Sequence, residues 1–499
     1  MRCKDRRVTN ANPYALLRSR FAGGLDRPFL VEPDGATTTY GDMDSRSAQF
    51  AGALRALGVA PGDRVAAQLE KSNDSVALYL GCLRVGAVYL PLNEAYTLPE
   101  VTYFTDDASP VVFVGREGQD PPGGPQVATL ASLLGLGAEP FDGIADRAAD
   151  DMIAMLYTSG TTGRSKGAML TCANLTTNAI ALHGLWGFNA DDVLLHALPV
   201  FHVHGLFVAL HCAMLSAAEV RFLPRFEVRV VREQLRQCTV MMGVPTFYAR
   251  LVADPLFGPQ DCASVRLFVA GSAPLTETAF RAFEAKTGHT ILERYGMTET
   301  GMITSNPLIG DRIAGTVGFA LPEVSVRVAD EHGSVVATGE TGVVEVRGPN
   351  VFKGYWGMPD KTAASFRPDG FFITGDVGTI DASGRLSLVG RESDLIIAGG
   401  YNVYPKEIEL LIDEVPGVVE SAVVGLAHPD MGEGIAAFVV VGPGAQVDGD
   451  TILSALDGRL ARFKQPRVVF IVEDLPRNAM GKVQKAALRA AHADTFMAK

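Results

Sequence analysis

Short apolar segments bounded by glycine or proline alternate with longer amphipathic segments over much of the chain. Residues 40–57 carry the period of an amphipathic helix and lead into short Val-, Ala- and Leu-rich runs at residues 63–69 and 87–92. Similar runs return at residues 193–198, 219–223, 240–244 and 265–270. Short buried strands that alternate with helices are typical of an α/β fold with a mostly parallel sheet. We therefore predict repeated strand–helix–strand crossovers in this part of the chain.

The periodicity changes near residue 317, where apolar and polar positions begin to alternate one by one. Residues 324–328 and 342–348 show this alternation, and turn-forming sequences occupy residues 331–333 and 381–384. Such alternation, interrupted by turns, is typical of antiparallel strands. We expect a small antiparallel, barrel-like unit that closes a large domain.

A short charged connector at residues 390–394 separates this unit from a further stretch of alternating strand-like and helix-like segments. Domain boundaries fall in short exposed segments that few contacts cross. We therefore expect a large N-terminal α/β domain over residues 1–392 and a smaller α+β C-terminal domain over residues 393–499. A chain of 499 residues also exceeds what one hydrophobic core usually supports.

Composition and charge exclude several classes of function. A net charge of -12 gives no basic surface of the kind that binds nucleic acid or an anionic membrane. The apolar runs, such as residues 208–215, fall short of the roughly 20 residues that a membrane helix needs. The six cysteines form no close pair, which fits a reducing compartment and excludes the usual zinc spacings. We expect a cytoplasmic protein without membrane or nucleic-acid partners.

The most informative local motif covers residues 156–167 and reads Leu-Tyr-Thr-Ser-Gly-Thr-Thr-Gly-Arg-Ser-Lys-Gly. Backbone N–H groups and hydroxyls of such a loop can turn toward one anion, while Lys166 adds a positive charge. The spacing differs from a Walker A loop, because only Arg164 and Ser165 separate Gly163 from the lysine. We predict a phosphate-binding loop outside the P-loop class.

Later segments carry residues suited to a nucleotide, although each alone has a structural explanation. They are residues 271–274 (Gly-Ser-Ala-Pro), residues 295–300 (Tyr-Gly-Met-Thr-Glu-Thr), Asp376 and Arg391. Tyr295 offers a flat face to an adenine ring, and Glu299 is a hard oxygen ligand for Mg²⁺. Asp376 and Arg391 suit a ribose diol. Taken singly, Asp376 could be a turn residue, Glu299 a helix-surface acid and Tyr295 a core residue.

Together and in this order, the segments resemble the adenylate-forming superfamily of acyl-CoA synthetases, firefly-type luciferases and peptide-synthetase adenylation domains. The resemblance covers about residues 28–489 and includes residues 399–409 (Gly-Gly-Tyr-Asn-Val-Tyr-Pro-Lys-Glu-Ile-Glu) and 476–482 (Pro-Arg-Asn-Ala-Met-Gly-Lys). It implies a large N-terminal domain of layered α/β sheets with a small β-barrel, and a mobile C-terminal domain. It also implies two reactions, in which ATP activates an acid as its adenylate and CoA then takes the acyl group.

The resemblance assigns the nucleotide contacts and the catalytic groups. The implied ATP and AMP contacts are Thr158, Ser159, Gly160, Thr161, Thr162, Gly163, Lys166, Gly271, Ser272, Ala273, Pro274, Glu293, Arg294, Tyr295, Gly296, Met297, Thr298, Asp376 and Arg391. The implied catalytic residues are Lys482, Glu299 and Thr158, with Glu299 as the ligand of Mg²⁺. An attacking carboxylate meets the α-phosphate of ATP as anion against anion, so a cation such as Lys482 is needed between them.

Residues near the start of the C-terminal domain are implied for the thioester step. Gly399, Gly400 and Tyr401 match the segment that contacts CoA, and Ser393 takes the hinge position where relatives often carry Asp or Lys. The resemblance further implies that a lysine acetyltransferase and a deacetylase act on Lys482. Neutralising that lysine would remove the charge that adenylation needs.

The predicted acid is a dicarboxylate, because charged residues fall in segments that line the expected acyl pocket. The predicted contacts are Arg250, Arg294, His204 and Ser272, and His202 lies two residues from His204. A buried arginine without an anion costs several kcal/mol, so a second carboxylate on the substrate would be its partner. The histidines are expected to shape the pocket rather than act as bases, since a carboxylate is already ionised at neutral pH.

The segments that carry this charge resemble malonyl-CoA and methylmalonyl-CoA synthetases at residues 242–248 and 292–299. Malonate or methylmalonate, with ATP, Mg²⁺ and CoA, is therefore the expected substrate set. The structural alternative places Arg250 on a helix exterior and pairs Arg294 with an acid such as Glu293. The functional alternatives are a short-chain, medium-chain or aryl acyl-CoA synthetase, a stand-alone enzyme that loads a carrier protein, and a non-catalytic relative.

Overall fold

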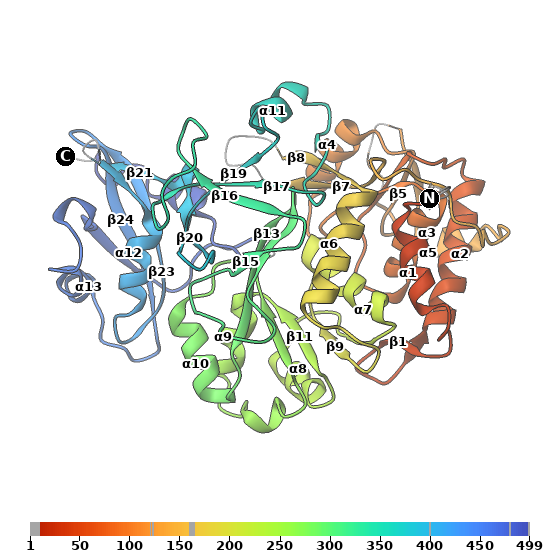
Figure 1. Ribbon diagram of the computed structural model, residues 1–499, viewed down its shortest axis with the longest axis horizontal. Helices are drawn as coiled ribbons and strands as arrows, with labels where there is room; N and C mark the ends of the chain where they lie inside the picture. Colours follow the sequence, from red (N-terminus) through yellow and green to blue (C-terminus); the bar gives the residue numbers. More distant parts are fainter. Residues whose placement is uncertain are drawn as a thin grey trace, which may run out of the picture.

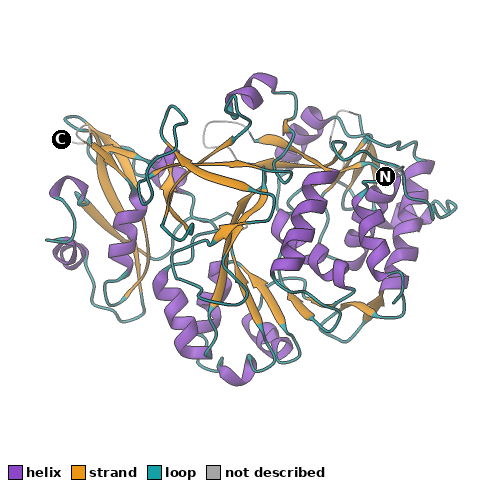
Figure 2. Cartoon of the chain, viewed as in Figure 1, coloured by secondary structure: helices purple, strands orange, loops and turns teal. Residues whose placement is uncertain are grey.

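The computed structural model describes residues 10–119, 121, 124–158, 165–398, 401–478 and 481–497. Figure 1 shows a lobe at the N-terminal end, a second lobe around α9 to α10, and the C-terminal segment on the opposite side from the N-terminus. Strands form layers with helices outside them (Figure 2). The predicted α/β architecture is confirmed.

A nine-stranded sheet forms the layer that carries much of the candidate site. Its order is β15-β14-β13-β12-β11-β9-β10-β1-β2, and the run from β13 through β1 is parallel. Its strands are β1 (Pro28–Val31), β2 (Thr37–Thr39), β9 (Val193–His196), β10 (Glu219–Phe222), β11 (Val240–Gly243), β12 (Leu267–Ala270), β13 (Ile291–Met297), β14 (Gly301–Ser305) and β15 (Phe319–Ala320). The four short apolar runs between residues 193 and 270 are indeed strands of one parallel layer.

A seven-stranded sheet packs as a second layer, in the order β18-β8-β7-β4-β3-β5-β6. Its strands are β3 (Arg64–Ala67), β4 (Val88–Pro91), β5 (Val112–Val114), β6 (Gln126–Ala128), β7 (Met152–Thr158), β8 (Lys166–Thr171) and β18 (Gly354–Tyr355). The pairs of β8 with β7 and with β18 are antiparallel, whereas the rest of the sheet is parallel.

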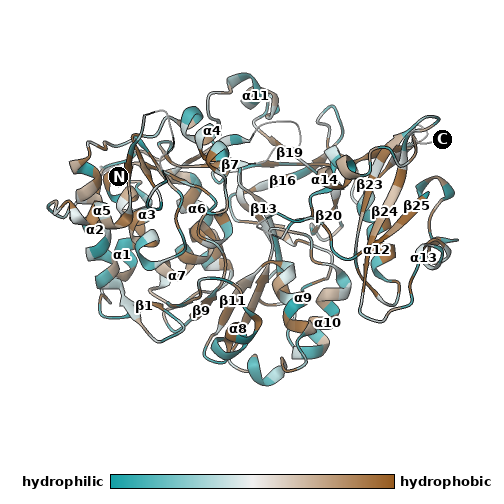
Figure 3. Cartoon of the chain, turned by 180° about the vertical axis from the view of Figure 1, so that it is seen from behind, coloured by the Kyte–Doolittle hydropathy of each residue, from teal (hydrophilic) through white to brown (hydrophobic). Residues whose placement is uncertain are grey.

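Helices cover these sheets and expose polar faces to solvent. They are α1 (Pro13–Phe21), α2 (Tyr40–Ala56), α3 (Asn73–Val85), α4 (Leu98–Ala108), α5 (Leu130–Gly135), α6 (Cys172–Leu185), the π-helix η1 (His204–Leu210), α7 (His211–Ser216), α8 (Val228–Leu235), α9 (Pro245–Ala253), η2 (Pro259–Asp261), α10 (Glu277–Thr287) and α11 (Pro359–Ala364). The outer helix α1 is largely hydrophilic in colour, whereas β11 is hydrophobic (Figure 3). The π-helix departs from the expected crossover pattern and lies beside the candidate site.

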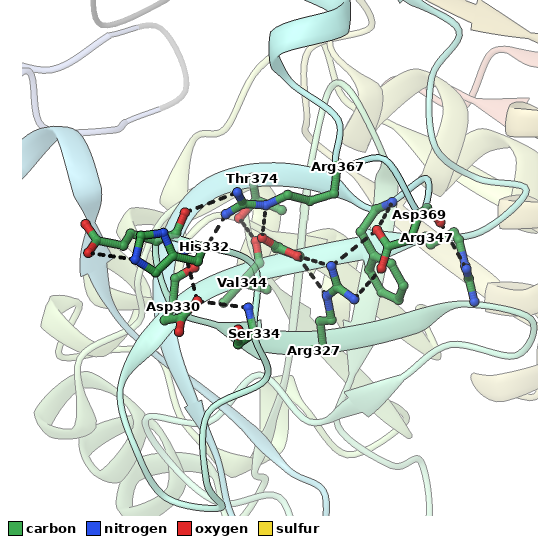
Figure 4. A network of polar contacts seen from close by, with 12 residues as sticks. Arg327, Asp330, His332, Ser334, Val344, Arg347, Arg367, Asp369 and Thr374 are labelled. Carbon is green, nitrogen blue, oxygen red and sulfur yellow. Dashed lines mark hydrogen bonds and ion pairs between the residues drawn. The ribbon is translucent and has the colours of Figure 1, made fainter.

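Antiparallel strands β16 (Ser325–Ala329), β17 (Gly342–Arg347), β19 (Phe372–Ile380) and β20 (Leu386–Arg391) form the predicted small unit. A fully buried carboxylate, Glu345, holds it together. Arg327 and Arg367 each donate to one of its oxygens at 2.7 Å, and Arg327 also pairs with Asp369 at 2.6 Å (Figure 4). Each buried charge therefore has a partner, as a low-dielectric interior requires. This network fixes the sheet whose β19 carries Asp376.

The C-terminal segment builds a sheet of its own, in which β22-β21-β24-β23 follow one another and β25 pairs with β24. Its elements are η3 (Glu392–Asp394), β21 (Ile396–Ala398), β22 (Tyr401–Val403), α12 (Pro405–Asp413), β23 (Val418–His428), β24 (Gly432–Val441), α13 (Gly449–Leu456), η4 (Arg462–Lys464), β25 (Val468–Val472) and α14 (Lys485–Ala491). The expected connector is shorter than predicted, because residues 390 and 391 end strand β20. The boundary at residue 392 stays a prediction. Within the described residues, no helix is both long and apolar enough to cross a membrane.

Candidate active site

The two ends of the predicted phosphate loop lie side by side. Strands β7 and β8 pair antiparallel, and their register sets Thr158 opposite Lys166. The predicted contacts Ser159, Gly160, Thr161, Thr162 and Gly163 lie outside the described residues. The strand pair nevertheless fixes where the loop begins and ends, so that a hydroxyl and an ammonium group meet at its base.

A buried carboxylate stands at that base. Glu299 Oε1 accepts hydrogen bonds from the Thr158 hydroxyl at 3.4 Å and from the Tyr355 hydroxyl at 3.1 Å. Lys166 Nζ lies 5.1 Å from the centre of the Tyr355 ring, within the range of a cation–π contact. Burial raises the pKa of Glu299. Tyr355 thus links the candidate metal ligand to the lysine of the loop.

These residues fit a magnesium ion that is bound mainly through a substrate. The described residues hold no cluster of three or more His, Cys, Asp or Glu side chains that could chelate a metal. Mg²⁺ commonly binds through one or two carboxylates together with phosphate oxygens and water. Glu299 is 5% exposed, and a cation beside it would favour its ionised form. Glu299 would hold the ion, which would offset charge on the pyrophosphate.

The predicted ribose contacts lie opposite each other on neighbouring strands. Asp376 of β19 pairs with Arg391 of β20, and the two side chains form an ion pair at 2.9 Å. The Tyr295 hydroxyl donates to the other carboxylate oxygen of Asp376 at 2.5 Å. Tyr295 is 7% exposed, so it is a core residue that also orients this carboxylate.

Lys482 approaches the same cluster from the C-terminal segment. Its backbone N–H donates to Asn478 Oδ1 at 3.0 Å. Burial lowers the pKa of Lys482 and the charge of Arg391 lowers it further, whereas Asp376 and Asp394 act in the opposite direction. The structure therefore brings the ammonium group of Lys482 near Asp376 and Arg391, although 106 residues separate Lys482 from Asp376 in the sequence.

The segments predicted to hold the adenine and the acid leave adjacent parallel strands at the same edge. Ala270 at the end of β12 pairs with Glu293 of β13, which places residues 271–274 beside Arg294 and the stretch that continues through Gly296, Met297 and Thr298. A Cβ atom on Gly271 would lie 2.3 Å from the guanidinium carbon of Arg294. A side chain at this position would have to displace the guanidinium group from where it lies.

The buried side chains of Arg294 and His204 form a polar cluster with the half-buried Ser272 next to this edge. The imidazole Nδ1 of His204 lies 3.3 Å from the Ser272 hydroxyl, and the charge of Arg294 acts on His204. Arg294 Nε and Nη2 and His204 Nε2 have no hydrogen-bond partner among the described residues. Arg294 is 3% exposed, and burial lowers its pKa to about 9. Burial lowers the pKa of His204 well below its usual range.

Unpartnered donors on a buried arginine are costly unless a ligand supplies an acceptor. Ser272 also adopts a left-handed backbone conformation, with φ of 72°, which is uncommon for a residue other than glycine. Strained backbone of this kind is concentrated at ligand sites. The arrangement is suited to an anion that reaches Arg294 from the nucleotide side.

One expected acid contact, Arg250, and the nearby His202 differ from the buried cluster in their surroundings. Arg250 is exposed on α9, and its guanidinium carbon lies 5.0 Å from the centre of the Phe226 ring. Arg250 therefore lies outside the buried cluster, and its contact with the acid stays a prediction. His202 has an unpartnered Nε2 among the described residues, and burial lowers its pKa to about 4. It is a neutral imidazole that lies close to His204.

The expected pairing of Arg294 with Glu293 does not occur, because alternate residues of a strand face opposite sides. Glu293 Oε1 has no hydrogen-bond partner within the described part of the chain, and burial raises the pKa of Glu293 to about 8. Glu293 therefore stays protonated at neutral pH and cannot neutralise the arginine.

The predicted CoA segment is described only in part. Gly399 and Gly400 lie outside the described residues. Tyr401 is 59% exposed, and its ring centre lies 4.6 Å from that of Phe463. Ser393 lies in η3, directly after β20, and its side chain is exposed. An exposed residue between two sheets is a reasonable hinge, and this role stays a prediction.

Comparison with known proteins gives a consistent family. The profile of the AMP-binding enzyme family matches residues 17–356, and that of the AMP-binding enzyme C-terminal domain matches residues 407–482. A feruloyl-CoA synthase from Amycolatopsis sp is 36% identical over 92% of this chain and 95% of its own length. A malonate–CoA ligase from Arabidopsis thaliana is 32% identical over 91% of this chain and 81% of its own length.

Solved structures agree with these relatives. The crystal structure of ATP-bound MatB from Rhodopseudomonas palustris superposes with a TM-score of 0.95 at 48% sequence identity. The match covers 98% of this chain and 100% of the MatB chain. The predicted resemblance to the adenylate-forming superfamily is confirmed.

Proposed function

Because the chain belongs to the AMP-binding enzyme family and is an ATP-dependent acyl-CoA ligase, we propose that its acid is malonate or methylmalonate. The observation that carries this proposal is the buried Arg294, whose Nε and Nη2 lack a hydrogen-bond partner within the described residues. One carboxylate of the acid would bind there. The other would remain free to react with ATP.

His204 and Ser272 support the same assignment. Their 3.3 Å contact sets a neutral imidazole and a hydroxyl beside the guanidinium. One of the two donates within this contact, which leaves the other a hydrogen for a carboxylate oxygen. A fatty acid offers no second acceptor to these groups, and an aryl acid such as ferulate offers neutral oxygens in place of a second carboxylate. A site built to hydrogen-bond a substrate discriminates strongly against an analogue that lacks the matching group, because its own buried donors then remain unpaired.

The reaction would follow from the placement of the remaining charges. The free carboxylate attacks the α-phosphorus of ATP, and Lys482 offsets the approach of the two anions. Asp376 and Arg391 would hold the ribose, while Lys166 and the loop after Thr158 would hold the phosphates. Mg²⁺ at Glu299 would stabilise the departing pyrophosphate. In the second reaction the CoA thiolate attacks the acyl carbon and AMP leaves, which completes the thioester.

A coupled assay of AMP release tests the substrate. With CoA present, malonate or methylmalonate should give a kcat/KM at least about 100-fold above butyrate and ferulate, the loss expected when a buried charged group stays unpaired. Equal turnover of butyrate, or a preference for ferulate, would refute the dicarboxylate assignment. Loss of activity with free CoA alone would favour a carrier protein as acceptor. Cytoplasmic location and acetylation of Lys482 stay predictions.

A further inference from the structure

The position of His204 depends on the first turn of the π-helix η1, and this turn is held from outside the substrate site. The next residue, Gly205, offers its backbone carbonyl to the imidazole Nε2 of His196 at 2.9 Å. A Cβ atom on Gly205 would lie 2.0 Å from the carbonyl oxygen of Pro199, so the turn packs closely against the segment before it. His196 is the last residue of β9 and is 1% exposed.

The partners of His196 determine its tautomer. A backbone carbonyl can only accept a hydrogen bond, so Nε2 must carry the hydrogen that points to Gly205. In a neutral imidazole the other nitrogen, Nδ1, is then an acceptor. Burial, together with the neighbouring charge of Lys71, lowers the pKa of His196 well below its usual range, which agrees with the neutral form.

Lys71 supplies the donor that Nδ1 requires. Its Nζ lies 2.8 Å from His196 Nδ1, 2.8 Å from the His196 carbonyl and 2.6 Å from the Leu223 carbonyl. It also lies 4.3 Å from the centre of the Phe222 ring, in a cation–π contact. Burial lowers the pKa of Lys71 well below its usual range, but three acceptors around one nitrogen match the three N–H groups of an ammonium ion and favour the charged form. Lys71 thus joins the ends of the paired strands β9 and β10 and fixes the hydrogen of His196 at the same time.

We propose that Lys71 and His196 are positioning residues that hold His204 in place for the second carboxylate of the acid. The contacts run from the Lys71 ammonium through the His196 imidazole to the Gly205 carbonyl, one residue from His204. This inference rests on the proposed function, since it concerns the same carboxylate. It assigns a role in acid selection to two residues that do not touch the substrate.

Two substitutions at His196 separate positioning from general stability. His196→Asn keeps an acceptor for Lys71 but is too short to reach Gly205, whereas His196→Gln retains an N–H group near the place of Nε2. Tyr79→Phe is the matched control, because the Tyr79 hydroxyl pairs with the buried imidazole of His211 at 2.7 Å, just beyond the other end of the π-helix. Each variant is first checked for a cooperative thermal unfolding transition.

The readout is the ratio of kcat/KM for malonate to kcat/KM for butyrate. His196→Asn should lower this ratio about five-fold to ten-fold, mainly through the KM for malonate, as expected for a displaced hydrogen-bonding group. His196→Gln should restore most of it, and Tyr79→Phe should leave it unchanged while lowering the unfolding temperature. A wild-type ratio in His196→Asn, or an equal fall in Tyr79→Phe, would overturn the proposal.

Nitrogen-15 spectra of histidine-labelled enzyme distinguish this inference from the proposed function. The imidazole signals of His204 should shift in His196→Asn and stay unchanged in Tyr79→Phe. If the wild type does not prefer malonate but these shifts occur, the proposed substrate is wrong and the positioning role stands. If the signals of His204 do not move in His196→Asn, the positioning role is wrong whatever the substrate.

Discussion

Replacement of Arg294 by methionine should have opposite effects on malonate activity and on protein stability. Methionine keeps a similar length but removes the charge and the donors at Nε and Nη2, which have no partner in the described part of the chain. Hydrogen bonds to a charged group contribute about 1.5–3 kcal/mol each, so two of them contribute about 3–6 kcal/mol. At about 1.4 kcal/mol per factor of ten, kcat/KM for malonate should fall about 100-fold to 10,000-fold.

The free enzyme should instead become more stable. Arg294 is 3% exposed and its neighbour Glu293 is protonated at neutral pH, so the substitution removes a buried charge that lacks an anion. Replacing a buried charged group by an apolar one of similar volume is often stabilising, and we expect a gain of about 1–3 kcal/mol in the free energy of unfolding. Urea denaturation without substrates measures this gain.

The assay compares malonate with butyrate by AMP release, with the KM for ATP measured in parallel. Butyrate activity should change less than about three-fold, because butyrate offers Arg294 no second carboxylate, and the KM for ATP shows whether Arg294 also contacts the nucleotide. Arg229→Met is the matched control, since Arg229 of α8 is exposed, pairs with Glu233 one helical turn away at 3.1 Å, and should tolerate the change with wild-type kinetics. Equal losses for malonate and butyrate, or a less stable protein, would refute the role assigned to Arg294.

Three further predictions concern the residues around this site. Burial raises the pKa of Glu293 to about 8, so the folded state holds a proton that the unfolded state releases above about pH 4.3. The free energy of unfolding should therefore fall between about pH 5 and pH 8, with a slope approaching 1.4 kcal/mol per pH unit. Glu293→Gln should flatten this slope in urea titrations, and an unchanged slope would exclude Glu293 as its source. Tyr355→Phe removes the hydroxyl that donates to Glu299 but keeps the ring beside Lys166. The Mg²⁺ concentration for half-maximal pyrophosphate exchange should rise about five-fold, and an unchanged Mg²⁺ requirement would show that the Tyr355 hydroxyl does not support Glu299 as a metal ligand. Glu345→Gln leaves Arg327 and Arg367 without their buried carboxylate and should lower the free energy of unfolding by about 3 kcal/mol in chemical denaturation. An unchanged free energy of unfolding would show that the network in Figure 4 contributes little to stability.

The strand and helix pattern could be predicted well because it depends on local periodicity. The runs predicted at residues 63–69 and 87–92 correspond to β3 (Arg64–Ala67) and β4 (Val88–Pro91), and the helix predicted from residue 40 is α2 (Tyr40–Ala56). Burial of a whole strand or of one helix face leaves a repeating trace in the sequence. The order of strands in each sheet leaves no such trace, because it depends on contacts between distant segments.

The same difference between local pattern and distant contacts explains which site residues could be predicted from the sequence. Arg294 could be predicted from its strand and its charge, whereas the exposure of Arg250, which stays a predicted acid contact, could not be read from the sequence. The side of α9 that faces solvent depends on the packing of α9 against its neighbours. Tyr355 was missed because β18 reaches Glu299 only through its pairing with β8, and Lys71 was missed because its partners lie more than 120 residues away.

A competition among acids for one enzyme tests the central claim most directly. Purified enzyme receives ATP, Mg²⁺ and CoA with equal concentrations of malonate, methylmalonate, butyrate and ferulate, and mass spectrometry measures each acyl-CoA at early times, so that the product ratios equal the ratios of kcat/KM. The account predicts that malonyl-CoA and methylmalonyl-CoA together exceed the other thioesters by at least about 100-fold. Butyryl-CoA or feruloyl-CoA in equal or greater amount would contradict it.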